Sequence, residues 1–342
     1  MTEKKEKLKK WGIPAGAALA LLLCIWGYRA FFGSTFHIQD TVYLYIDEDD
    51  TADSVKAKIK ATARPGISAG FSILSALGGY TVESGRYGVG PDDNMFGLFR
   101  RLKQGRQTPV KLTLPSVRTM DRLAGALGKK LMMDSAAVAQ SLTDSAFCRR
   151  FGYDTATIAC LFVPDTYEVY WNVSLDNFMK RMQKEHDRFW NEERRRKAAE
   201  AGLTPEEVVT LASIVDEETA NNGEKPMVAG MYINRLRIGM PLQADPTIKF
   251  ALRDFSLRRI YHNHLNVESP YNTYRNAGLP PGPIRIPSVA GIDAVLDHVR
   301  HDYLYMCAKE DFSGTHNFAR TYSEHLANAA RYSAALNRRG IK

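Results

Sequence analysis

The residues with the clearest chemical potential are three consecutive carboxylic acids, Asp216, Glu217 and Glu218, at the end of a predicted helix. A carboxyl group held against apolar side chains has its charged form disfavoured, which raises its pKa. A raised pKa allows a carboxyl group to act as a general acid near neutral pH. The alternative is that Asp216 and Glu218 are helix-end residues that bind nearby arginines or backbone groups.

The period of the helix separates the three acids. A capping box of Thr204 and Glu207 starts the helix, and the apolar residues that follow form a broad arc at 100° per residue. Glu218 falls inside this arc, and Asp216 falls near its opposite edge. Glu217 falls on the polar face, where we expect it to be solvated. The period therefore rejects Glu217 as the acid but leaves Asp216 and Glu218 open.

Five polar residues further along the chain are candidates for substrate binding: Gln243, Asp245, Asn272, Tyr274 and His316. Gln243 and Asp245 flank a turn, and Asn272 and Tyr274 lie in a Pro- and Gly-rich loop over residues 269–288. Long loops of this kind are usually functional or disordered, and rigid prolines with aromatics argue against disorder. Aromatic faces beside amide groups can bind sugar rings. For His316, a place in the core is an equal alternative.

The elements that must position these residues form a mixed pattern. Alternation predicts strands over 41–46 and 110–114, and a turn signal at Ser84-Gly85 predicts a strand or hairpin over 80–89. Apolar residues at helical spacing predict helices over 53–63, 94–105 and 116–131. These describe a small α+β module over residues 36–160, in which no chemistry is visible. A long helix is expected from residue 174 to Gly202, with its charged run EERRRK on a solvated face near the C-terminal end. A second amphipathic helix over 226–237, a strand over 302–309 and a last helix over 321–337 follow.

An apolar segment precedes all of these elements. No charged residue occurs between Trp11 and Tyr28, and a helix over 12–32 would be about 31 Å long, enough to cross a membrane. Five lysines ahead of it predict, by the positive-inside rule, a cytoplasmic tail over 1–11 and export of everything after residue 33. A cleaved signal peptide is the alternative, but no clear cleavage site follows. We expect a single-pass anchor in the cytoplasmic (inner) membrane.

Composition sets outer limits. At 342 residues, with 44% hydrophobic and 25% charged residues, the chain suits about two globular domains and not a disordered, collagen-like or polytopic protein. The net charge of +8 suits nucleic acid, an anionic membrane surface or an acidic polymer. Export argues against nucleic acid as a partner. The four cysteines have neither CxxC spacing nor zinc-like pairing with histidine, so we expect no metal, no cofactor and no disulfide framework.

Four long segments, in the same order and spacing, resemble one family: LASIVDEET (211–219), VAGMYINRLRIGMPLQADPT (228–247), YNTYRNAGLPPGPI (271–284) and DYLYMCA with GTHNFARTYSEH (302–325). VPDTYEV (163–169) and SGRYGV (84–89) also match. The family is that of the YceG-like, or MltG, endolytic murein transglycosylases. The resemblance covers most of the expected exported chain.

The resemblance implies an α+β architecture: one transmembrane helix, a LysM-like module over 36–160 and a mixed α/β catalytic domain over 161–342. It implies cleavage of the MurNAc-β-1,4-GlcNAc bond of nascent peptidoglycan strands with a 1,6-anhydro-MurNAc product, which ends strand elongation. Peptidoglycan and cell-wall synthesis proteins are then the implied partners. The family's motif ends in Ile-Val-Glu-Lys-Glu-Thr with the second Glu catalytic, and this position is Glu218.

The chain departs from the family pattern at two places. Asp216 and Glu217 replace the first Glu and the Lys of that motif, which puts any secondary role of Asp216 in doubt. Residues 159–161, Ala-Cys-Leu, replace the usual Glu-Gly-aromatic. Two other functions stay open: a peptidoglycan hydrolase with Asp216 or Asp245 as second carboxylate, and a membrane-anchored scaffold that binds glycan without cutting it.

Overall fold

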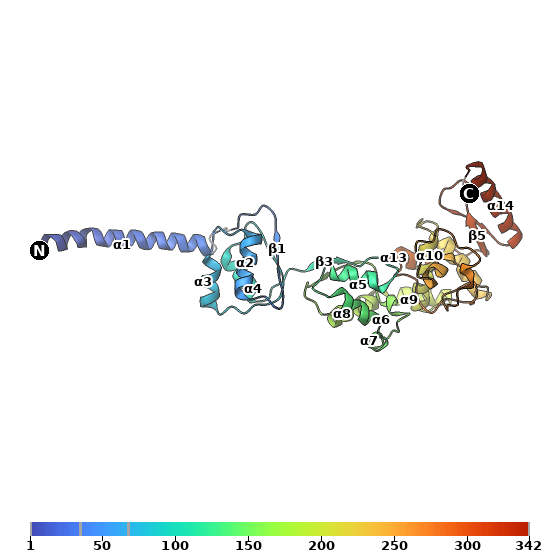
Figure 1. The fold of residues 1–342 in the computed structure, drawn as a ribbon, viewed down its shortest axis with the longest axis horizontal. Coiled ribbons are helices and arrows are strands. Elements are labelled where there is room, and N and C mark those ends of the chain that lie inside the picture. Colours follow the sequence, from blue (N-terminus) through green and yellow to red (C-terminus); the bar gives the residue numbers. More distant parts are fainter. Residues whose placement is uncertain (1, 34–35, 67–68, 341–342) are drawn as a thin grey trace. The chain divides into compact units, whose positions relative to one another are not determined.

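The computed structural model describes residues 2–33, 36–66 and 69–340 and is a mixed α+β protein, as predicted (Figure 1). The described chain divides into two compact units. Unit 1 comprises residues 1–111 with 130–132 and 168–173, and unit 2 comprises 112–129, 133–167 and 174–342. Three two-stranded sheets are present in the described part: β1 with β2, β3 with β4, and β5 with β6.

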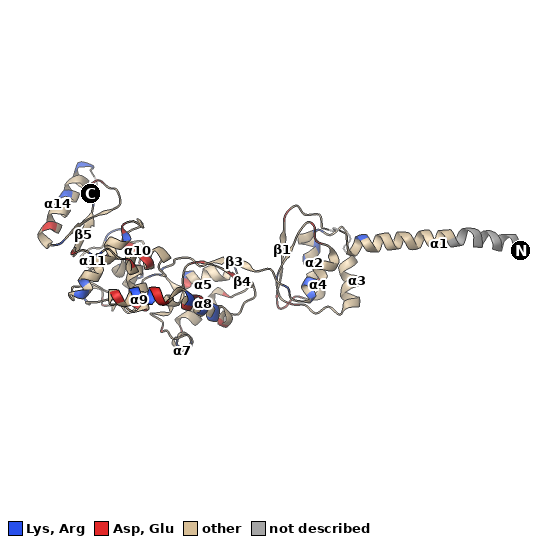
Figure 2. Cartoon of the chain, turned by 180° about the vertical axis from the view of Figure 1, so that it is seen from behind, with Lys and Arg blue, Asp and Glu red and all other residues tan. Residues whose placement is uncertain are grey.

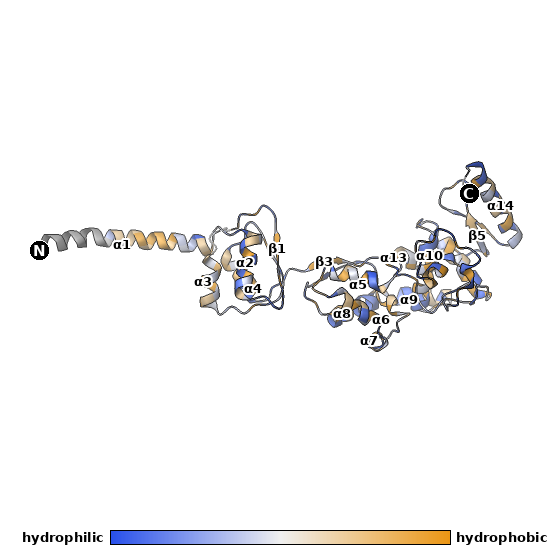
Figure 3. Ribbon diagram, viewed as in Figure 1, coloured by the Kyte–Doolittle hydropathy of each residue, from blue (hydrophilic) through white to orange (hydrophobic). Residues whose placement is uncertain are grey.

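The N-terminal helix α1 runs from Thr2 to Phe31. Its window Pro14–Phe31 has a mean hydropathy of 1.4, and Figure 3 shows the apolar colour along this stretch. By length and composition this helix is sufficient to cross a membrane. Its last turn belongs to unit 1, because Ala30 is fully buried there and the Phe32 and Phe96 rings lie 5.2 Å apart.

Unit 1 is built on an antiparallel strand pair. β1 (Val42–Ile46) pairs with β2 (Gly85–Val89), with Leu44 opposite Tyr87. Alternation places Leu44 and Ile46 in the core, where they meet helices α2 (Ala52–Ala63), α3 (Ala69–Gly78) and α4 (Met95–Lys103). The expected strand over 80–89 therefore forms only from Gly85, and it pairs with β1 instead of forming a local hairpin. Helix α3 was not predicted.

The chain between the strands β3 (Val110–Thr113) and β4 (Thr166–Val169) holds four short helices. These are α5 (Met120–Gly128), α6 (Ser135–Thr143), α7 (Ser145–Arg149) and the 3-10 helix η1 (Ile158–Leu161). The expected domain boundary at residue 160 falls inside η1. All four η1 residues are buried, and Cys160 belongs to the same core cluster as the helix that carries the acids.

The long helix expected from residue 174 to 202 is wrong, because the structure has two helices. α8 (Leu175–Phe189) ends at Trp190, and α9 (Glu192–Ala201) starts with Asn191, whose side chain caps the backbone N–H of Arg194 at 3.0 Å. The EERRRK run therefore begins α9 instead of ending a long helix. Figure 2 shows acidic and basic residues together along this helix.

The centre of unit 2 is α10 (Pro205–Glu218), which starts with the predicted capping box of Thr204 and Glu207. It packs against α11 (Lys225–Arg237), α12 (Asp245–Ala251) and α13 (Val289–Leu296). Every residue from Val208 to Val215 is buried, including Thr210 and Ser213. The expected polar, solvated face of this helix is therefore wrong. Thr210 and Ser213 satisfy their hydroxyl groups on backbone carbonyls of the same helix.

The C-terminal part adds a hairpin and a helix to unit 2. Between α12 and α13 the chain has only the short 3-10 helix η2 (His264–Asn266), so the loop expected over 269–288 is confirmed. β5 (Tyr305–Ala308) and β6 (His316–Ala319) form an antiparallel pair with Met306 opposite Phe318. Helix α14 (Tyr322–Arg338) starts with a capping box of Thr321 and Glu324 and packs on this pair. The strand β6 was not predicted.

Candidate active site

Glu218 is the last residue of α10, and it faces α11. The hydroxyl group of Tyr232 on α11 donates a hydrogen bond of 2.7 Å to Oε1 of Glu218. Burial raises the pKa of Glu218 to about 7, and the bond from Tyr232 opposes this rise. The carboxylate of Asp245 adds to the rise, while the charges of His316 and Arg235 lower the pKa. Glu218 can therefore be protonated or ionised near neutral pH, as a group that gives and then takes a proton requires.

A cavity of about 230 Å³ opens in front of this carboxyl group. Its lining comes from α10, α11, the start of α12, the loop after η2 and the β5–β6 hairpin, and consists of Glu218, Met231, Tyr232, Arg235, Gln243, Asp245, Tyr274, Met306, Cys307, Ala308 and His316. Four of the five residues that we expected to bind substrate thus share one cavity with Glu218.

Asp245 and Tyr274 form a pair on one wall of the cavity. The Tyr274 hydroxyl donates a hydrogen bond of 2.5 Å to Oδ1 of Asp245. Beside them Gln243 has a φ of 49°, in the left-handed region that costs energy for a residue other than glycine. Its backbone N–H donates to the Thr273 carbonyl at 3.0 Å, which ties the two cavity-lining segments together. Strained residues of this kind gather at functional sites.

His316 reaches the cavity from β6 and is anchored by Glu224. The imidazole Nδ1 lies 3.0 Å from Oε2 of Glu224, and the His316 backbone N–H donates to Oε1 at 2.6 Å. Both side chains are mostly buried, at 17% and 8% exposed. The Glu224 carboxylate fixes the orientation of the imidazole ring through Nδ1. The ring therefore lines the cavity in one fixed orientation.

Arg235 is a cavity residue that the sequence analysis missed. It is 7% exposed, and its guanidinium donates to the carbonyl groups of Leu304 and Leu242, both at 2.6 Å. Arg235 takes part in none of the ion pairs among the described residues. Its positive charge is therefore not neutralised by a carboxylate, and it lowers the pKa of Glu218 in the same cavity. Its spacing from Tyr232, three residues on the same helix, places both on one face. That spacing was the available signal, but an arginine in an amphipathic helix is ordinarily a surface residue.

Asn272 does not line the cavity. It is fully buried, and its amide donates to the carbonyls of Leu265 and Val267 at 2.9 and 2.8 Å. Its Oδ1 accepts a hydrogen bond from the backbone N–H of Tyr274 at 3.0 Å. Asn272 therefore holds the loop that presents Tyr274, and its position does not support direct contact with substrate.

The other two acids at the C-terminal end of α10 are engaged in ion pairs. Oδ1 of Asp216 lies 2.7 Å from Nζ of Lys225, and its carboxylate also accepts hydrogen bonds from Ser288. Glu217 binds Arg118 through both oxygens, at 2.8 and 2.7 Å, and Arg285 at 2.9 Å. The expectation that Glu217 is solvated is therefore wrong, since its side chain is only 10% exposed. Asp216 therefore has the role that we gave as the alternative to a catalytic acid: it lies at the end of the helix and binds nearby groups.

Comparison with known proteins identifies the family. Residues 44–331 match the model of the YceG-like family. A Bacillus subtilis protein named endolytic murein transglycosylase is 37% identical over 130 residues, which are 38% of this chain and 35% of that protein. A Streptococcus pneumoniae serotype 2 protein of the same name is 26% identical over 298 residues, 77% of this chain and 53% of that protein.

The fold has a counterpart among solved structures. The crystal structure of a yceG-like protein from Listeria monocytogenes aligns with a TM-score of 0.55 at 24% identity, over 85% of this chain and 99% of that one. The chain spans about half or less of the length of the two curated relatives. The match to the family model covers most of the sequence, and the chain therefore belongs to the YceG-like family.

Proposed function

We propose that the chain is a lytic transglycosylase that cleaves the MurNAc-β-1,4-GlcNAc bond of peptidoglycan, with Glu218 as its acid and base. The observation that carries this proposal is a carboxyl group with a pKa of about 7, bonded to Tyr232 at the wall of an open cavity. The names of the relatives from Bacillus subtilis and Streptococcus pneumoniae support the same reaction.

In the first step, protonated Glu218 gives its proton to the glycosidic oxygen. The bond between this oxygen and the anomeric carbon of MurNAc breaks, and positive charge develops on the sugar ring. The carboxylate of Asp245 lines the same cavity, and a fixed negative charge there favours that developing charge. The GlcNAc end of the strand leaves with the proton.

In the second step, the Glu218 carboxylate accepts a proton from the 6-hydroxyl group of the same MurNAc. O6 then bonds to the anomeric carbon, which yields the 1,6-anhydro end and returns Glu218 to its acid form. No water is consumed. The attack is intramolecular, so proximity supplies a large part of the rate without a second carboxylate as nucleophile.

A hydrolase is the second candidate, because Asp245 shares the cavity with Glu218 and could act as the other carboxylate. Asp216 no longer supports this alternative, since it is held by Lys225 and Ser288. A scaffold that binds glycan without cutting is weakened by the raised pKa of Glu218, which a purely structural carboxylate does not need.

Digestion of purified glycan strands followed by mass spectrometry separates these functions. We expect new MurNAc ends with the mass of the anhydro sugar, whereas a hydrolase adds one water per bond cut and makes each new MurNAc end heavier by one water. Glu218→Gln keeps the volume but cannot release a proton, so we expect at least a roughly 10²–10⁴-fold loss of rate. Glu192→Gln, the same change at an exposed residue of α9, is the matched control and keeps normal rates. Near-normal cleavage by Glu218→Gln contradicts the proposal.

We also propose that α1 anchors the protein in the cytoplasmic membrane with its catalytic unit outside the cytoplasm. The five lysines that precede the apolar stretch support this orientation. Of the LysM-like module expected over 36–160, we propose only the part that lies in unit 1, up to residue 111, supported by a strand pair with α2 and α3 between its strands. Anchored at the outer face of the cytoplasmic membrane, the enzyme would cut nascent glycan strands, end their elongation and work beside cell-wall synthesis proteins.

A further inference from the structure

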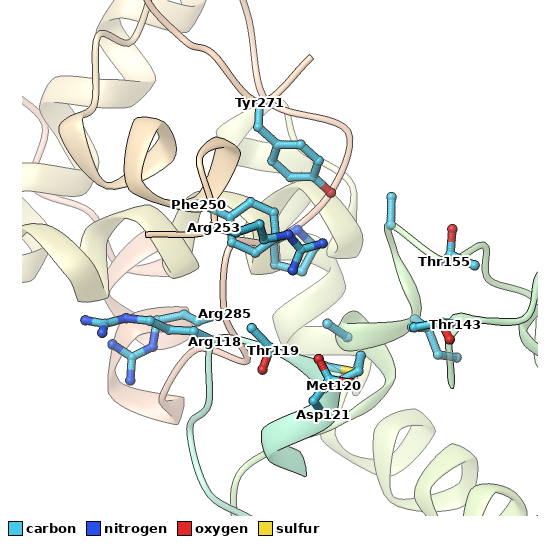
Figure 4. Close-up of a pocket in the computed structure, with 14 residues that line it drawn as sticks. Arg118, Thr119, Met120, Asp121, Thr143, Thr155, Phe250, Arg253, Tyr271 and Arg285 are labelled. Carbon is cyan, nitrogen blue, oxygen red and sulfur yellow. The ribbon is translucent and has the colours of Figure 1, made fainter. Parts of the chain in front are cut away.

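Unit 2 has a second cavity, of about 360 Å³, that the proposed reaction does not use. Figure 4 shows Arg253 and Tyr271 on one side of it and Thr119 and Asp121 on the other. Its volume lies within the range of about 300–1,000 Å³ that is usual for ligand sites. The lining combines guanidinium, hydroxyl and aromatic groups, so it suits a polar ligand with a negative charge.

Three arginines line this cavity, but they are not equivalent. Arg118 and Arg285 are already bound to Glu217, at 2.7 to 2.9 Å. Arg253 is exposed, and none of the ion pairs found within the described residues involves it. Its guanidinium lies over the Phe250 ring, 4.9 Å from the centroid, which orients it without neutralising it. The one carboxylate in the lining, Asp121, is exposed to solvent.

The backbone of Arg253 gives an independent indication. It has a φ of 55° directly after α12, a position at which glycine or asparagine is usual. An arginine there costs backbone energy that glycine would not, and the side chain of this arginine lines the second cavity. In the described chain four residues other than glycine have such a φ, and two of them, Gln243 and Arg253, line the two cavities.

The second cavity neighbours the first through shared elements. Helix α12 begins with Asp245 in the catalytic cavity and carries Phe250 in the second, about 8 Å along the helix axis. The loop after η2 supplies Tyr274 to one cavity and Tyr271 to the other. An extended peptide covers about 3.3 Å per residue, so roughly two or three stem residues match the length of α12 between these two positions.

We propose that this second cavity binds a carboxylate of the peptide stem attached to the MurNAc whose bond is cut, with Arg253 as its main partner. The inference rests on the proposed function. In stem-bearing strands the lactyl carboxyl group of MurNAc is closed in the amide bond to the stem, so the free carboxylates belong to the stem. A planar guanidinium binds a carboxylate through two parallel hydrogen bonds, and Thr119 and the Tyr271 hydroxyl offer further donors. Arg253 is thus a residue that determines specificity and takes no part in proton transfer.

The test compares two lipid-free substrates: glycan strands that carry peptide stems, and the same strands after an amidase has removed the stems. The amidase leaves a free lactyl carboxylate on each MurNAc, so the second substrate has its negative charge on the sugar and none at the distance of the stem. Lipid-free strands exclude a pyrophosphate as the source of the anion. We expect the wild type to have a higher kcat/KM on stem-bearing strands, mainly through KM. Arg253→Gln should lower the ratio of the two kcat/KM values about tenfold, and Arg253→Lys, which keeps the charge, should restore part of it.

Arg338→Gln is the matched control, because Arg338 is an exposed arginine at the end of α14 and leaves the ratio unchanged. Two results overturn the inference while the proposed function stands: equal KM for both substrates in the wild type, or an Arg253→Gln variant with the wild-type ratio. A fold defect in Arg253→Gln lowers both activities and leaves the ratio intact, which also counts against the inference. If the wild type cuts neither substrate, the proposed function itself fails.

Discussion

At the scale of single residues, the groups around Glu218 shift its pKa in opposite directions. Burial and the charge of Asp245 raise its pKa, while the Tyr232 hydrogen bond and the charges of His316 and Arg235 lower it. The result, about 7, lies where both protonation states are populated. A carboxyl group that must serve as acid and then as base within one turnover needs this balance more than it needs either extreme.

The pH dependence of cleavage follows from that balance. The first step needs protonated Glu218 in the free enzyme, so kcat/KM should be level below about pH 7 and fall tenfold per unit above it. Tyr232→Phe removes the hydrogen bond that favours the charged form, so the pKa of Glu218 rises and the falling limb moves to higher pH. Profiles of kcat/KM against pH measure this shift.

The control for this shift is Tyr87→Phe in unit 1. Tyr87 is also buried, and its hydroxyl donates to the Glu83 carbonyl at 2.9 Å, far in sequence from the cavity residues. In Tyr87→Phe, kcat/KM should fall with pH over the same range as in the wild type. A wild-type limb near the ordinary carboxyl pKa of 4.5, or one that Tyr232→Phe does not move, would show that Glu218 is not the acid.

Glu217 shows that neighbours on one helix can have unrelated roles. Its carboxylate joins Arg118 and Arg285, which come from segments 99 and 68 residues away in the chain. Glu217→Gln leaves both guanidinium groups with a weaker acceptor in a mostly buried place. We expect it to lower the free energy of unfolding by about 1–3 kcal/mol at pH 7, measured by urea denaturation. Glu192→Gln should change it by less than about 0.5 kcal/mol. Equal stability of the two variants would contradict this role.

The sequence could predict part of this site. The family motif selected Glu218, and polar residues at turns pointed to Gln243, Asp245 and Tyr274, which the structure brings to one cavity. The burial of Glu217 and Asn272 could not be predicted in the same way, because it depends on contacts between distant segments. The helical period assumes that a helix has one buried face and one exposed face. In α10 every residue from Val208 to Val215 is buried, so this assumption fails.

At the scale of elements, local signals were more reliable than long-range ones. The capping box at Thr204 starts α10 as predicted. The last helix, expected over 321–337, is α14, and a capping box at Thr321 starts it. The break between α8 and α9 was missed because the apolar stripe continues to Trp190, which masked the capping signal of Asn191. The strand β6 was missed because its residues have no alternating pattern, and its pairing with β5 specifies it instead.

Helix α11 and the segment that leads into β5 are closely packed at Gly230. A Cβ atom on Gly230 would lie 2.3 Å from the Val299 carbonyl oxygen and 2.9 Å from Nε2 of His301. Gly230→Ala therefore forces the two segments apart and should lower the unfolding free energy by about 1–3 kcal/mol or more. It should also reduce cleavage, since α11 carries Tyr232 and Arg235. Thermal unfolding and strand digestion measure the two effects.

The matched control is Gly125→Ala in α5, where the added Cβ meets nothing within 4 Å. Alanine favours a helix over glycine, so this variant should gain about 0.5–1 kcal/mol. The two substitutions are the same chemical change with opposite expected signs. A Gly230→Ala variant that gains stability like Gly125→Ala would show that α11 does not pack on the 299–301 segment in solution.

At the scale of the whole molecule, the proposed function gives the apolar helix and unit 2 separate tasks. The proposed chemistry uses residues of unit 2 alone, and the catalytic cavity is lined by residues from Glu218 to His316. The apolar helix α1, our proposed membrane anchor, belongs to unit 1, where Ala30 is fully buried and Phe32 contacts Phe96. Removal of the anchor should therefore change where the protein is found without removing the capacity to cut glycan.

Two truncations test this division, one that starts at residue 29 and one that starts at residue 36. Both should appear in the soluble fraction and cleave purified strands, with Glu218→Gln versions as inactive controls. The longer fragment keeps Ala30 and Phe32 packed on unit 1, so its unit 1 should unfold at a higher temperature. Fractionation and calorimetry measure both properties. A fragment from residue 36 that stays with membranes would place the anchor elsewhere, and one that is folded but inactive on strands would show that α1 contributes to catalysis.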